Sequence, residues 1–280
     1  MKKREVIRAE VLGFCMGVRG AIRKAEIAAV GAKDDKTVKT FGPLIHNRKA
    51  LEELSRKGVD KIESTDDIEH GTVVIRAHGV ERDIYNKLVE KGLEVIDGTC
   101  PLVLKSMRTV DRYSREGRHV ILVGDATHGE IRALYGYASD VEVVENEEQA
   151  LNANVPDGTM VIAQTTVSME KYEKVCELLE SRNPSIEVID SICPATRNRQ
   201  EALMRLSEKV EAIVVIGGKN SSNTKRLFEL ALKSGKPAWH IEEAAELPPE
   251  IRAYSIVGIT AGASTPDWCI DEVEETIRLM

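Results

Sequence analysis

The sequence lacks a surplus of positive charge. Its 280 residues carry 39 Lys and Arg against 46 Asp and Glu, which gives a formal net charge of −7. This composition argues against a nucleic-acid-binding protein, because such proteins need excess cations to neutralise phosphates. No apolar run approaches the ~20 residues of a membrane span. The basic start leads into charged residues instead of an apolar signal core. We therefore expect a cytoplasmic protein without a membrane segment.

Paired cysteine motifs are also missing. The sequence has five cysteines, and none forms a CxxC pair. An odd number of cysteines in a reducing compartment argues against a disulfide framework. The absence of CxxC excludes a local zinc or ferredoxin-type motif. Any special cysteine is therefore expected to be catalytic or metal-bound.

The chain does contain an internal repeat. Residues 94–101 and 187–194 match at six of eight positions, 93 residues apart. A weaker third copy lies at residues 11–15, where Cys15 precedes Cys100 by 85 residues. Each copy reads as a strand, a turn, a cysteine and a helix. The spacing indicates three units of similar length.

The pattern within the units indicates an α/β fold. Short β-branched runs alternate with amphipathic helices, which is typical of parallel sheets built from βαβ units. We predict three small α/β domains related by pseudo-threefold symmetry. The first spans residues 1–98 and is joined by the C-terminal tail 266–280. The second spans 99–191, and the third spans 192–265.

Ligands of parallel sheets bind at the carboxyl ends of the strands. In one class of element these positions hold Cys15, Cys100 and Cys193. If the three domains face a common axis, three thiolates meet there and can hold a metal centre with one open position. That centre could be zinc with a water or histidine ligand, or a [4Fe–4S] cluster with one free iron. The lack of a short-range ligand pair favours the cluster.

The other strand ends carry hydrogen-bond donors suited to a diphosphate. Neither a GxxxxGK[ST] loop nor a GxGxxG spacing is present, so a nucleoside triphosphate or dinucleotide is not expected. Glu130 follows His128 by two residues in such a loop, which makes it a candidate acid/base group. The candidate donors are His46, His78, His128, Ser221, Ser222, Asn223 and Ser264.

Other chemistry-bearing residues have structural interpretations. Cys176 and Cys269 lie on apolar helix faces and are expected to behave as small buried hydrophobes. Residues 221–223 would ordinarily cap the following helix, and the same amides can bind an anion. Three histidines lack a strand-end loop context and are interpreted as structural or surface residues: His70, His119 and His240.

These residues together resemble the 4-hydroxy-3-methylbut-2-enyl diphosphate reductases, which catalyse the last step of the methylerythritol phosphate route to isoprenoids. The resemblance runs from about residue 6 to residue 267. One loop departs from the family pattern, because a His-Pro-Glu-Val sequence is replaced by His-Gly-Glu-Ile at residues 128–131. The matching segments are residues 13–18, 45–47, 77–80, 97–103, 164–166, 190–200, 220–223 and 260–267.

The resemblance implies an iron–sulfur oxidoreductase. Cys15, Cys100 and Cys193 would hold one central [4Fe–4S] cluster whose open iron binds the substrate hydroxyl. Glu130, with His128 and Thr165, would supply the proton that lets this hydroxyl leave as water. Electrons would come from a ferredoxin or flavodoxin, and the products would be isopentenyl and dimethylallyl diphosphate. The implied substrate-binding set is His46, His78, His128, Thr165, Thr166, Ser221, Ser222, Asn223 and Ser264.

Two alternatives remain open from the sequence. A quinolinate synthase would share the three pseudo-repeated domains with one cluster cysteine each, although it should show basic residues for a dicarboxylate. The second alternative is a phosphometabolite-binding module without enzymatic activity, in which the same three cysteines hold structural zinc.

Overall fold

The computed structural model describes residues 4–32 and 37–280, so the basic start at residues 1–3 lies outside the described part. The chain divides into two compact units. The terminal unit comprises Met1–Val18, Ile45–Glu53 and Pro194–Met280. The central unit comprises Arg19–Leu44 and Leu54–Cys193.

The first sheet of the central unit is parallel, in the order β3-β2-β4-β5. Val73 and Ile75 of β4 pack with Leu88 of α3 in the core on one face. α2 (Arg48–Arg56) follows the loop after β2, and its residues are shared between the two units. The strands and the helix of this layer are β2 (Val38–Phe41), β3 (Val59–Ile62), β4 (Thr72–Ile75), β5 (Glu94–Asp97) and α3 (Arg82–Glu90).

The second sheet of the central unit is parallel in the order β7-β6-β8-β9. β6 and β8 are buried along their whole length, as expected for strands covered on both faces. Alternate side chains of β6 therefore enter two cores, one under α4 and α5 and one under α6 and α7. The elements are α4 (Pro101–Arg115), β6 (Val120–Val123), α5 (Gly129–Tyr135), β7 (Val141–Val144), α6 (Glu147–Asn152), β8 (Met160–Ala163), α7 (Met169–Arg182) and β9 (Glu187–Ile189).

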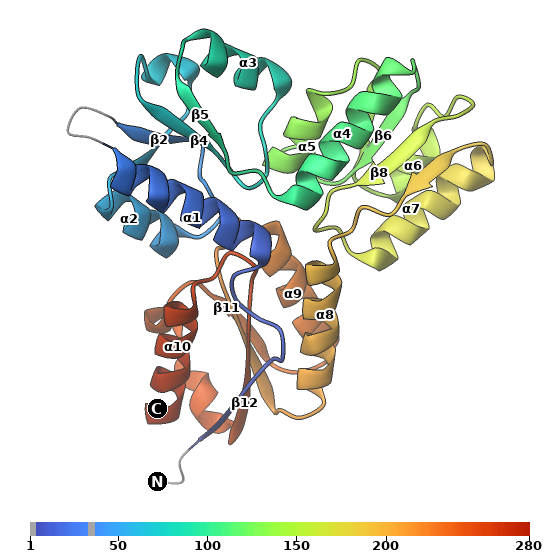
Figure 1. Cartoon of the computed structure of the whole chain (residues 1–280). Coiled ribbons are helices and arrows are strands. Elements are labelled where there is room, and N and C mark those ends of the chain that lie inside the picture. Colours follow the sequence, from blue (N-terminus) through green and yellow to red (C-terminus); the bar gives the residue numbers. More distant parts are fainter. Residues whose placement is uncertain (1–3, 33–36) are drawn as a thin grey trace. The chain divides into compact units, whose positions relative to one another are not determined.

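The terminal unit holds the third parallel sheet, in the order β1-β12-β10-β11. α10 covers one face of this sheet, and α8 and α9 cover the other (Figure 1). α1 (Met16–Gly31) begins directly after Cys15. The remaining elements are β1 (Glu5–Arg8), α8 (Pro194–Ser207), β10 (Ala212–Ile216), α9 (Ser222–Lys233), β11 (Ala238–Ile241), β12 (Ile256–Ala261) and α10 (Asp267–Leu279), with 3-10 turns at Thr65–Asp67, Ala244–Glu246 and Pro249–Ala253.

The predicted first domain, 1–98 with the tail 266–280, needs correction at both ends. β1 pairs in parallel with β12, with Glu5 opposite Ile256. Ile270 and Val273 of α10 pack in the core of that same sheet. Both chain ends therefore belong to the third sheet. The N-terminal strand forms its hydrogen bonds with β12, and the C-terminal helix packs on one face of the sheet.

The α/β fold class is confirmed, with three parallel four-stranded sheets. All three sheets share one topology. If the strands of a sheet are numbered so that the fourth precedes a cysteine, their order across the sheet is 2-1-3-4. The strands before Cys100, Cys193 and Cys15 are β5, β9 and β1 respectively. Among the described helices, none is long and apolar enough to cross a membrane.

Candidate active site

The predicted site residues lie where the strand order reverses within each sheet. This switch point lies between β2 and β4, between β6 and β8, and between β10 and β12. Loops after such neighbouring strands diverge and leave room for a ligand. The loops that follow these six strands carry His46, His78, His128 with Glu130, Thr165 with Thr166, Ser221 to Asn223, and Ser264.

Glu130 is the most deeply buried carboxylate of these loops, with 1% of its surface exposed. Its Oε1 accepts a hydrogen bond from the backbone N–H of Thr165 at 2.7 Å. Its Oε2 lies 2.8 Å from the Thr165 hydroxyl. Burial raises the pKa of Glu130 to about 7, against the opposing effect of the two Thr165 bonds. The carboxyl group can therefore both hold and release a proton near neutral pH.

His128 fixes the start of the helix that carries Glu130. It is the N-cap of α5, and its Nδ1 accepts a hydrogen bond from the Glu130 N–H at 3.1 Å. An accepting Nδ1 places the proton of the neutral ring on Nε2, so that nitrogen remains a donor. The rings of His128 and His78 meet edge to face with centroids 5.3 Å apart. The central unit thus brings together His78, His128, Glu130 and Thr165.

The loop that departs from the family pattern keeps a regular helix start. His128 has φ −72° and ψ 137°, and Gly129 is the first residue of α5. A Cβ at Gly129 would lie 3.2 Å from the guanidinium carbon of Arg76. Arg76 donates from Nε to the Gly79 carbonyl at 2.9 Å, and burial lowers its pKa. The guanidinium therefore occupies the space beside Gly129, and the glycine leaves room for it.

Gln164 is a residue of this loop that the sequence-based site set omits. It is 1% exposed, and its Nε2 donates to the Thr166 hydroxyl at 2.8 Å. Its Oε1 accepts from the Asp125 N–H at 3.2 Å. The amide thus ties the loop after β8 to the loop after β6. The sequence did offer a sign of this role, because Gln164 is a polar residue directly after a buried strand.

In the terminal unit, the loops after β10 and β12 collect polar groups. Ser221 caps α9 by accepting from the Thr224 N–H at 3.3 Å. The Asn223 side chain is 5% exposed, and its Nδ2 has no hydrogen-bond partner among the described residues. A buried amide donor without a partner is costly unless a ligand satisfies it.

His46 and Ser264 also meet in this unit. The Ser264 hydroxyl donates to the His46 carbonyl at 3.0 Å. A Cβ at Gly218 would lie only 2.3 Å from that carbonyl oxygen, so glycine is required for the close approach. The terminal unit therefore places His46 beside the loops of Ser221 and Ser264.

The three candidate metal ligands have equivalent backbone anchors. The N–H of Cys100 donates to the Ala77 carbonyl at 3.0 Å, and that of Cys193 to the Thr165 carbonyl at 3.0 Å. The N–H of Cys15 donates to the Ala263 carbonyl at 3.1 Å. Each cysteine is thus tied to the loop after the third strand of its sheet, which also carries a predicted substrate contact.

The environment of these three thiols suits metal ligation. All three lie outside any disulfide and are half-buried, and each directly precedes a helix, α1, α4 or α8. The Val18 N–H points at the Cys15 sulfur at 3.5 Å. Helix N-termini stabilise thiolates through the helix dipole and unpaired N–H groups. The donor set therefore fits an iron–sulfur cluster or another thiolate-bound metal.

Cys176 and Cys269 differ from this set. They are 7% and 3% exposed, within helices α7 and α10. Burial raises the pKa of each thiol to about 12, which keeps both protonated. Two of the histidines interpreted as structural form local hydrogen bonds. His119 Nδ1 lies 2.9 Å from Asp140 Oδ1, and His240 Nε2 lies 2.8 Å from the Gly217 carbonyl oxygen.

Arg199 is a second residue absent from the predicted set. It is 3% exposed, and its Nη2 donates to the Gly13 carbonyl at 2.6 Å. Its Nη1 donates to Ala195 on its own helix at 2.9 Å. Arg199 thereby anchors the turn two residues before Cys15. The sequence did offer a sign of this role, because Arg199 lies on the same face of α8 as the apolar residues Ala202 and Leu203.

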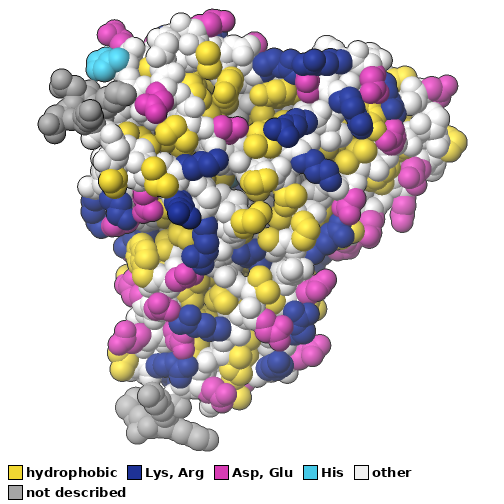
Figure 2. All heavy atoms as spheres, viewed as in Figure 1, with side chains coloured by type: hydrophobic (Ala, Val, Ile, Leu, Met, Phe, Trp, Pro, Cys, Tyr) yellow, Lys and Arg dark blue, Asp and Glu magenta, His cyan; other side chains and the backbone are white. Residues whose placement is uncertain are grey.

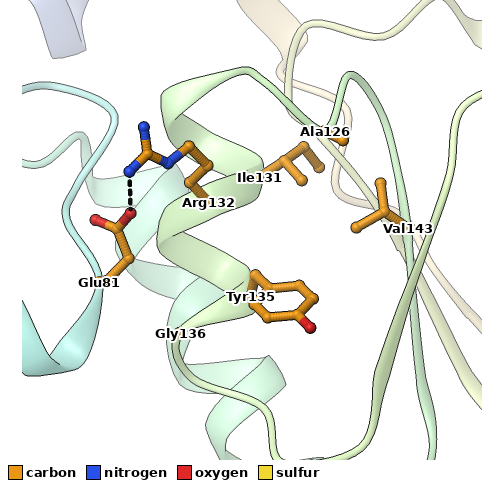
Figure 3. Close-up of a pocket in the computed structure, with 7 residues that line it drawn as sticks. All are labelled: Glu81, Ala126, Ile131, Arg132, Tyr135, Gly136 and Val143. Carbon is orange, nitrogen blue, oxygen red and sulfur yellow. Dashed lines mark ion pairs between the residues drawn. The ribbon is translucent and has the colours of Figure 1, made fainter.

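A hollow of about 360 Å³ lies beside α5, and none of the predicted site residues lines it. Figure 3 shows Ile131, Tyr135, Ala126 and Val143 around it, with Arg132 turned toward Glu81. The Arg132 and Glu81 side chains form an ion pair at 3.1 Å. α5 thus presents Glu130 to the interior of the central unit and a mainly apolar face to this hollow.

The family profile described as LytB protein matches residues 6–278. This chain belongs to the LytB family. The LytB chain is 43% identical to the 4-hydroxy-3-methylbut-2-enyl diphosphate reductase of Treponema denticola, over 97% of this chain and 98% of the relative. It is 37% identical to the protein of the same name from Alkaliphilus oremlandii, over 98% and 99% of the two chains.

Solved structures give the same result for the LytB chain. One matching structure is that of an (E)-4-hydroxy-3-methyl-but-2-enyl diphosphate reductase, described as the terminal enzyme of the non-mevalonate pathway. It aligns with this chain with a TM-score of 0.73 and 37% identity, over 99% of this chain and 100% of the other. The LytB chain also aligns with the Plasmodium falciparum E-1-hydroxy-2-methyl-but-2-enyl-4-diphosphate reductase with a TM-score of 0.90, 30% identity and coverage of 99% and 88%. These matches set aside the quinolinate synthase alternative.

Proposed function

We propose that this LytB chain is an oxidoreductase that converts 4-hydroxy-3-methylbut-2-enyl diphosphate to isopentenyl and dimethylallyl diphosphate. The reaction breaks the C4–O bond, takes up two electrons and two protons, and releases the hydroxyl as water. The observation that carries the proposal is the buried pair of Glu130 and Thr165 at the switch point of the second sheet. Full-length similarity to reductases of this name supports the substrate.

The protonation of the leaving hydroxyl is assigned to Glu130. Near its pKa of about 7, roughly half of the carboxyl groups carry a proton. That proton on Oε2 faces the Thr165 hydroxyl at 2.8 Å, and a hydroxyl can accept one proton and donate its own. Thr165 would therefore orient the substrate alcohol and relay the proton to its oxygen. The fixed backbone bond to Oε1 holds the carboxyl group in place for this transfer.

The diphosphate is assigned to the donors of the strand-end loops. The unpartnered Nδ2 of Asn223 and the N-terminus of α9 offer hydrogen bonds and a positive helix end to phosphate oxygens. His46, His78, His128, Thr166, Ser221, Ser222 and Ser264 would complete the set. Binding of this remote charged group would hold the C4–O bond at the reacting centre.

The cofactor is assigned to the three anchored cysteines. Cys15, Cys100 and Cys193 would hold a [4Fe–4S] cluster with one open iron, because all three are half-buried thiols at helix starts. When bound, such a cluster supplies single electrons and a Lewis-acidic iron. The electrons would reach the protein from a ferredoxin or flavodoxin.

The test is the oxidation of a reduced viologen dye by anaerobically reconstituted protein, with and without 4-hydroxy-3-methylbutenyl diphosphate. The visible spectrum and the iron content are recorded on the same sample. We expect oxidation that depends on substrate and yields both isoprenoid diphosphates. A sample loaded with iron that stays inert toward this substrate would contradict the proposed reaction. A colourless protein that binds zinc instead would contradict the cofactor.

A further inference from the structure

One face of α4 carries a stripe of cations. Lys105, Arg108, Arg112 and Arg115 recur at spacings of three, four and three residues, which places them on one side of an α-helix. All four side chains are exposed. Figure 2 shows Lys and Arg side chains spread over the region where α4 lies in Figure 1. We call these four residues the α4 stripe.

The α4 stripe is only partly neutralised by neighbouring acids. Among the residues that the structure describes, Lys105 and Arg108 form no ion pair. Asp111, the acid of this helix, is shared between Arg82 and Arg115. The stripe is therefore a local positive field on a chain whose net charge is −7.

The helix on the other face of the second sheet, α7, carries the opposite charge. The exposed acids of α7 recur at the same spacing as the α4 stripe, at Glu170, Glu173, Glu177 and Glu180. The two helices cover opposite faces of the second sheet. On the second sheet, the row of exposed cations therefore lies on α4, whose N-cap is Cys100, and the row of exposed acids lies on α7.

The α4 stripe begins next to a proposed cluster ligand. Cys100 is the N-cap of α4, and Lys105 lies roughly 8 Å farther along the helix axis. Lys24 of α1 donates to the Asp97 carbonyl at 2.5 Å, three residues before Cys100. α1 thus lies against this turn and adds the exposed cations Arg19 and Arg23. Positive charge flanks the approach to Cys100 on two helices.

We propose that the α4 stripe is the docking surface for an acidic ferredoxin that delivers electrons to the centre held at Cys100. The inference rests on the proposed function, because that reaction consumes two electrons that a reduced donor must deliver. Opposite charge accelerates the encounter of such partners and orients them. Electron-transfer complexes are small and short-lived, so a stripe along one helix is sufficient.

The experiment compares two doubly substituted proteins that change the net charge equally. Lys105→Glu with Arg108→Glu reverses the stripe. Lys87→Glu with Lys209→Glu is the matched control, because both lysines are exposed and lie away from α4, Lys87 on α3 and Lys209 in the turn after α8. Turnover is measured with a reduced acidic [2Fe–2S] ferredoxin and, separately, with a reduced viologen dye. Binding of the same ferredoxin is also measured directly by calorimetry, without turnover.

We expect the stripe variant to raise the KM for ferredoxin and weaken its binding about tenfold or more at low ionic strength. The difference should vanish near ~1 M salt, where charges are screened within about 3 Å. Dye-driven turnover should stay within about twofold of wild type, because a small dye needs no docking surface. The control variant should match wild type in every assay.

Three results would overturn the docking proposal. The first is unchanged ferredoxin binding in the stripe variant, and the second is an equal loss in the control variant. The third is that the wild-type protein binds flavodoxin or a short RNA and does not bind ferredoxin. Absence of dye-driven turnover in the wild type would instead contradict the proposed function, and the binding measurement would still decide the docking surface.

Discussion

Burial decides the chemistry of Glu130. A surface glutamate is ionised at neutral pH, but Glu130 is 1% exposed and its pKa is raised to about 7. The two Thr165 bonds oppose the desolvation and keep the ionised form accessible. An acid whose pKa lies near the working pH transfers protons in both directions most effectively.

Glu130→Gln should keep the fold and the bound iron but lose most turnover. Glutamine can accept from the Thr165 N–H and donate to its hydroxyl, so both contacts survive without a transferable proton. Wild-type turnover should fall about tenfold per pH unit above the Glu130 pKa of about 7. The pH profile of the dye assay measures this. Near wild-type turnover in the variant would remove Glu130 from the proton path.

The same substitution tests the raised pKa through stability. The folded state binds the Glu130 proton more tightly than the unfolded state does. The protonated Glu130 therefore contributes to the free energy of unfolding below the usual carboxyl pKa, and this contribution is lost as the pH rises through about 7. The free energy of unfolding of the wild type should therefore decline by roughly 3 kcal/mol relative to Glu130→Gln across that window. Denaturant titrations at several pH values measure this difference. Parallel curves would contradict the raised pKa.

Helix starts are the elements on which the site is built. His128 is the N-cap of α5, whose first turn carries Glu130, and Ser221 is the N-cap of α9, whose first turn carries Asn223. Cys100 is the N-cap of α4. The first N–H groups of a helix lack intrahelical partners and attract anions or thiolates. One structural device therefore serves the proposed acid, the diphosphate and the metal ligands.

Gly129→Pro should stabilise the protein by about 0.5–1 kcal/mol. Proline is favoured at the first helical position, and the φ and ψ of His128 suit a residue before proline. The proline ring must displace the Arg76 guanidinium by a few tenths of an ångström. Thermal melts and iron content measure the effect. Destabilisation that disappears when Arg76→Ala is added would show that the guanidinium cannot move.

Substitutions at Ser221 should separate capping from anion binding. Ser221→Ala removes the cap of α9 and should cost about 1 kcal/mol of stability while raising the KM for the diphosphate substrate. Ser221→Asp should restore stability but raise the KM further, because its carboxylate repels phosphate. Thermal melts and steady-state kinetics measure the two effects. A substrate KM in Ser221→Asp equal to that of wild type would place the diphosphate elsewhere.

For the molecule as a whole, three copies of one topology present three equivalent cysteines. Cys15, Cys100 and Cys193 each follow an edge strand and bond to the loop after the third strand of the same sheet. These backbone bonds, at 3.0 to 3.1 Å, show that the three copies share one local geometry at the cysteine, although the sequence match at Cys15 is weaker. The proposed centre would take one cysteine ligand from each copy.

Iron content should distinguish the two classes of cysteine. Cys100→Ser should lose most of the bound iron and the visible absorption after anaerobic reconstitution, because one thiolate ligand is removed. Cys176→Ala is the control, since this thiol is buried in α7 and remains protonated. The control should lose some stability but keep its iron. Equal iron in wild type and Cys100→Ser would contradict ligation by three cysteines.

The sequence was sufficient for the features that local patterns encode. Alternating strand and helix periodicity predicted the parallel α/β class, which the three sheets confirm. The repeated turn before Cys100 and Cys193 picked out the candidate ligands, because neighbouring residues in a repeat keep their local geometry. The loss of proline at Gly129 left the shape of that loop undefined, and the structure shows a regular helix start there.

Long-range pairing and burial required the tertiary structure. Glu5 lies opposite Ile256 in the third sheet, and no local pattern in β1 specifies a strand so distant in the chain. The pKa of Glu130 and the anchoring role of Arg199 likewise depend on which distant groups exclude water and accept hydrogen bonds. Residue type and spacing are properties of the chain, whereas desolvation and hydrogen-bond partners arise only when distant segments pack together.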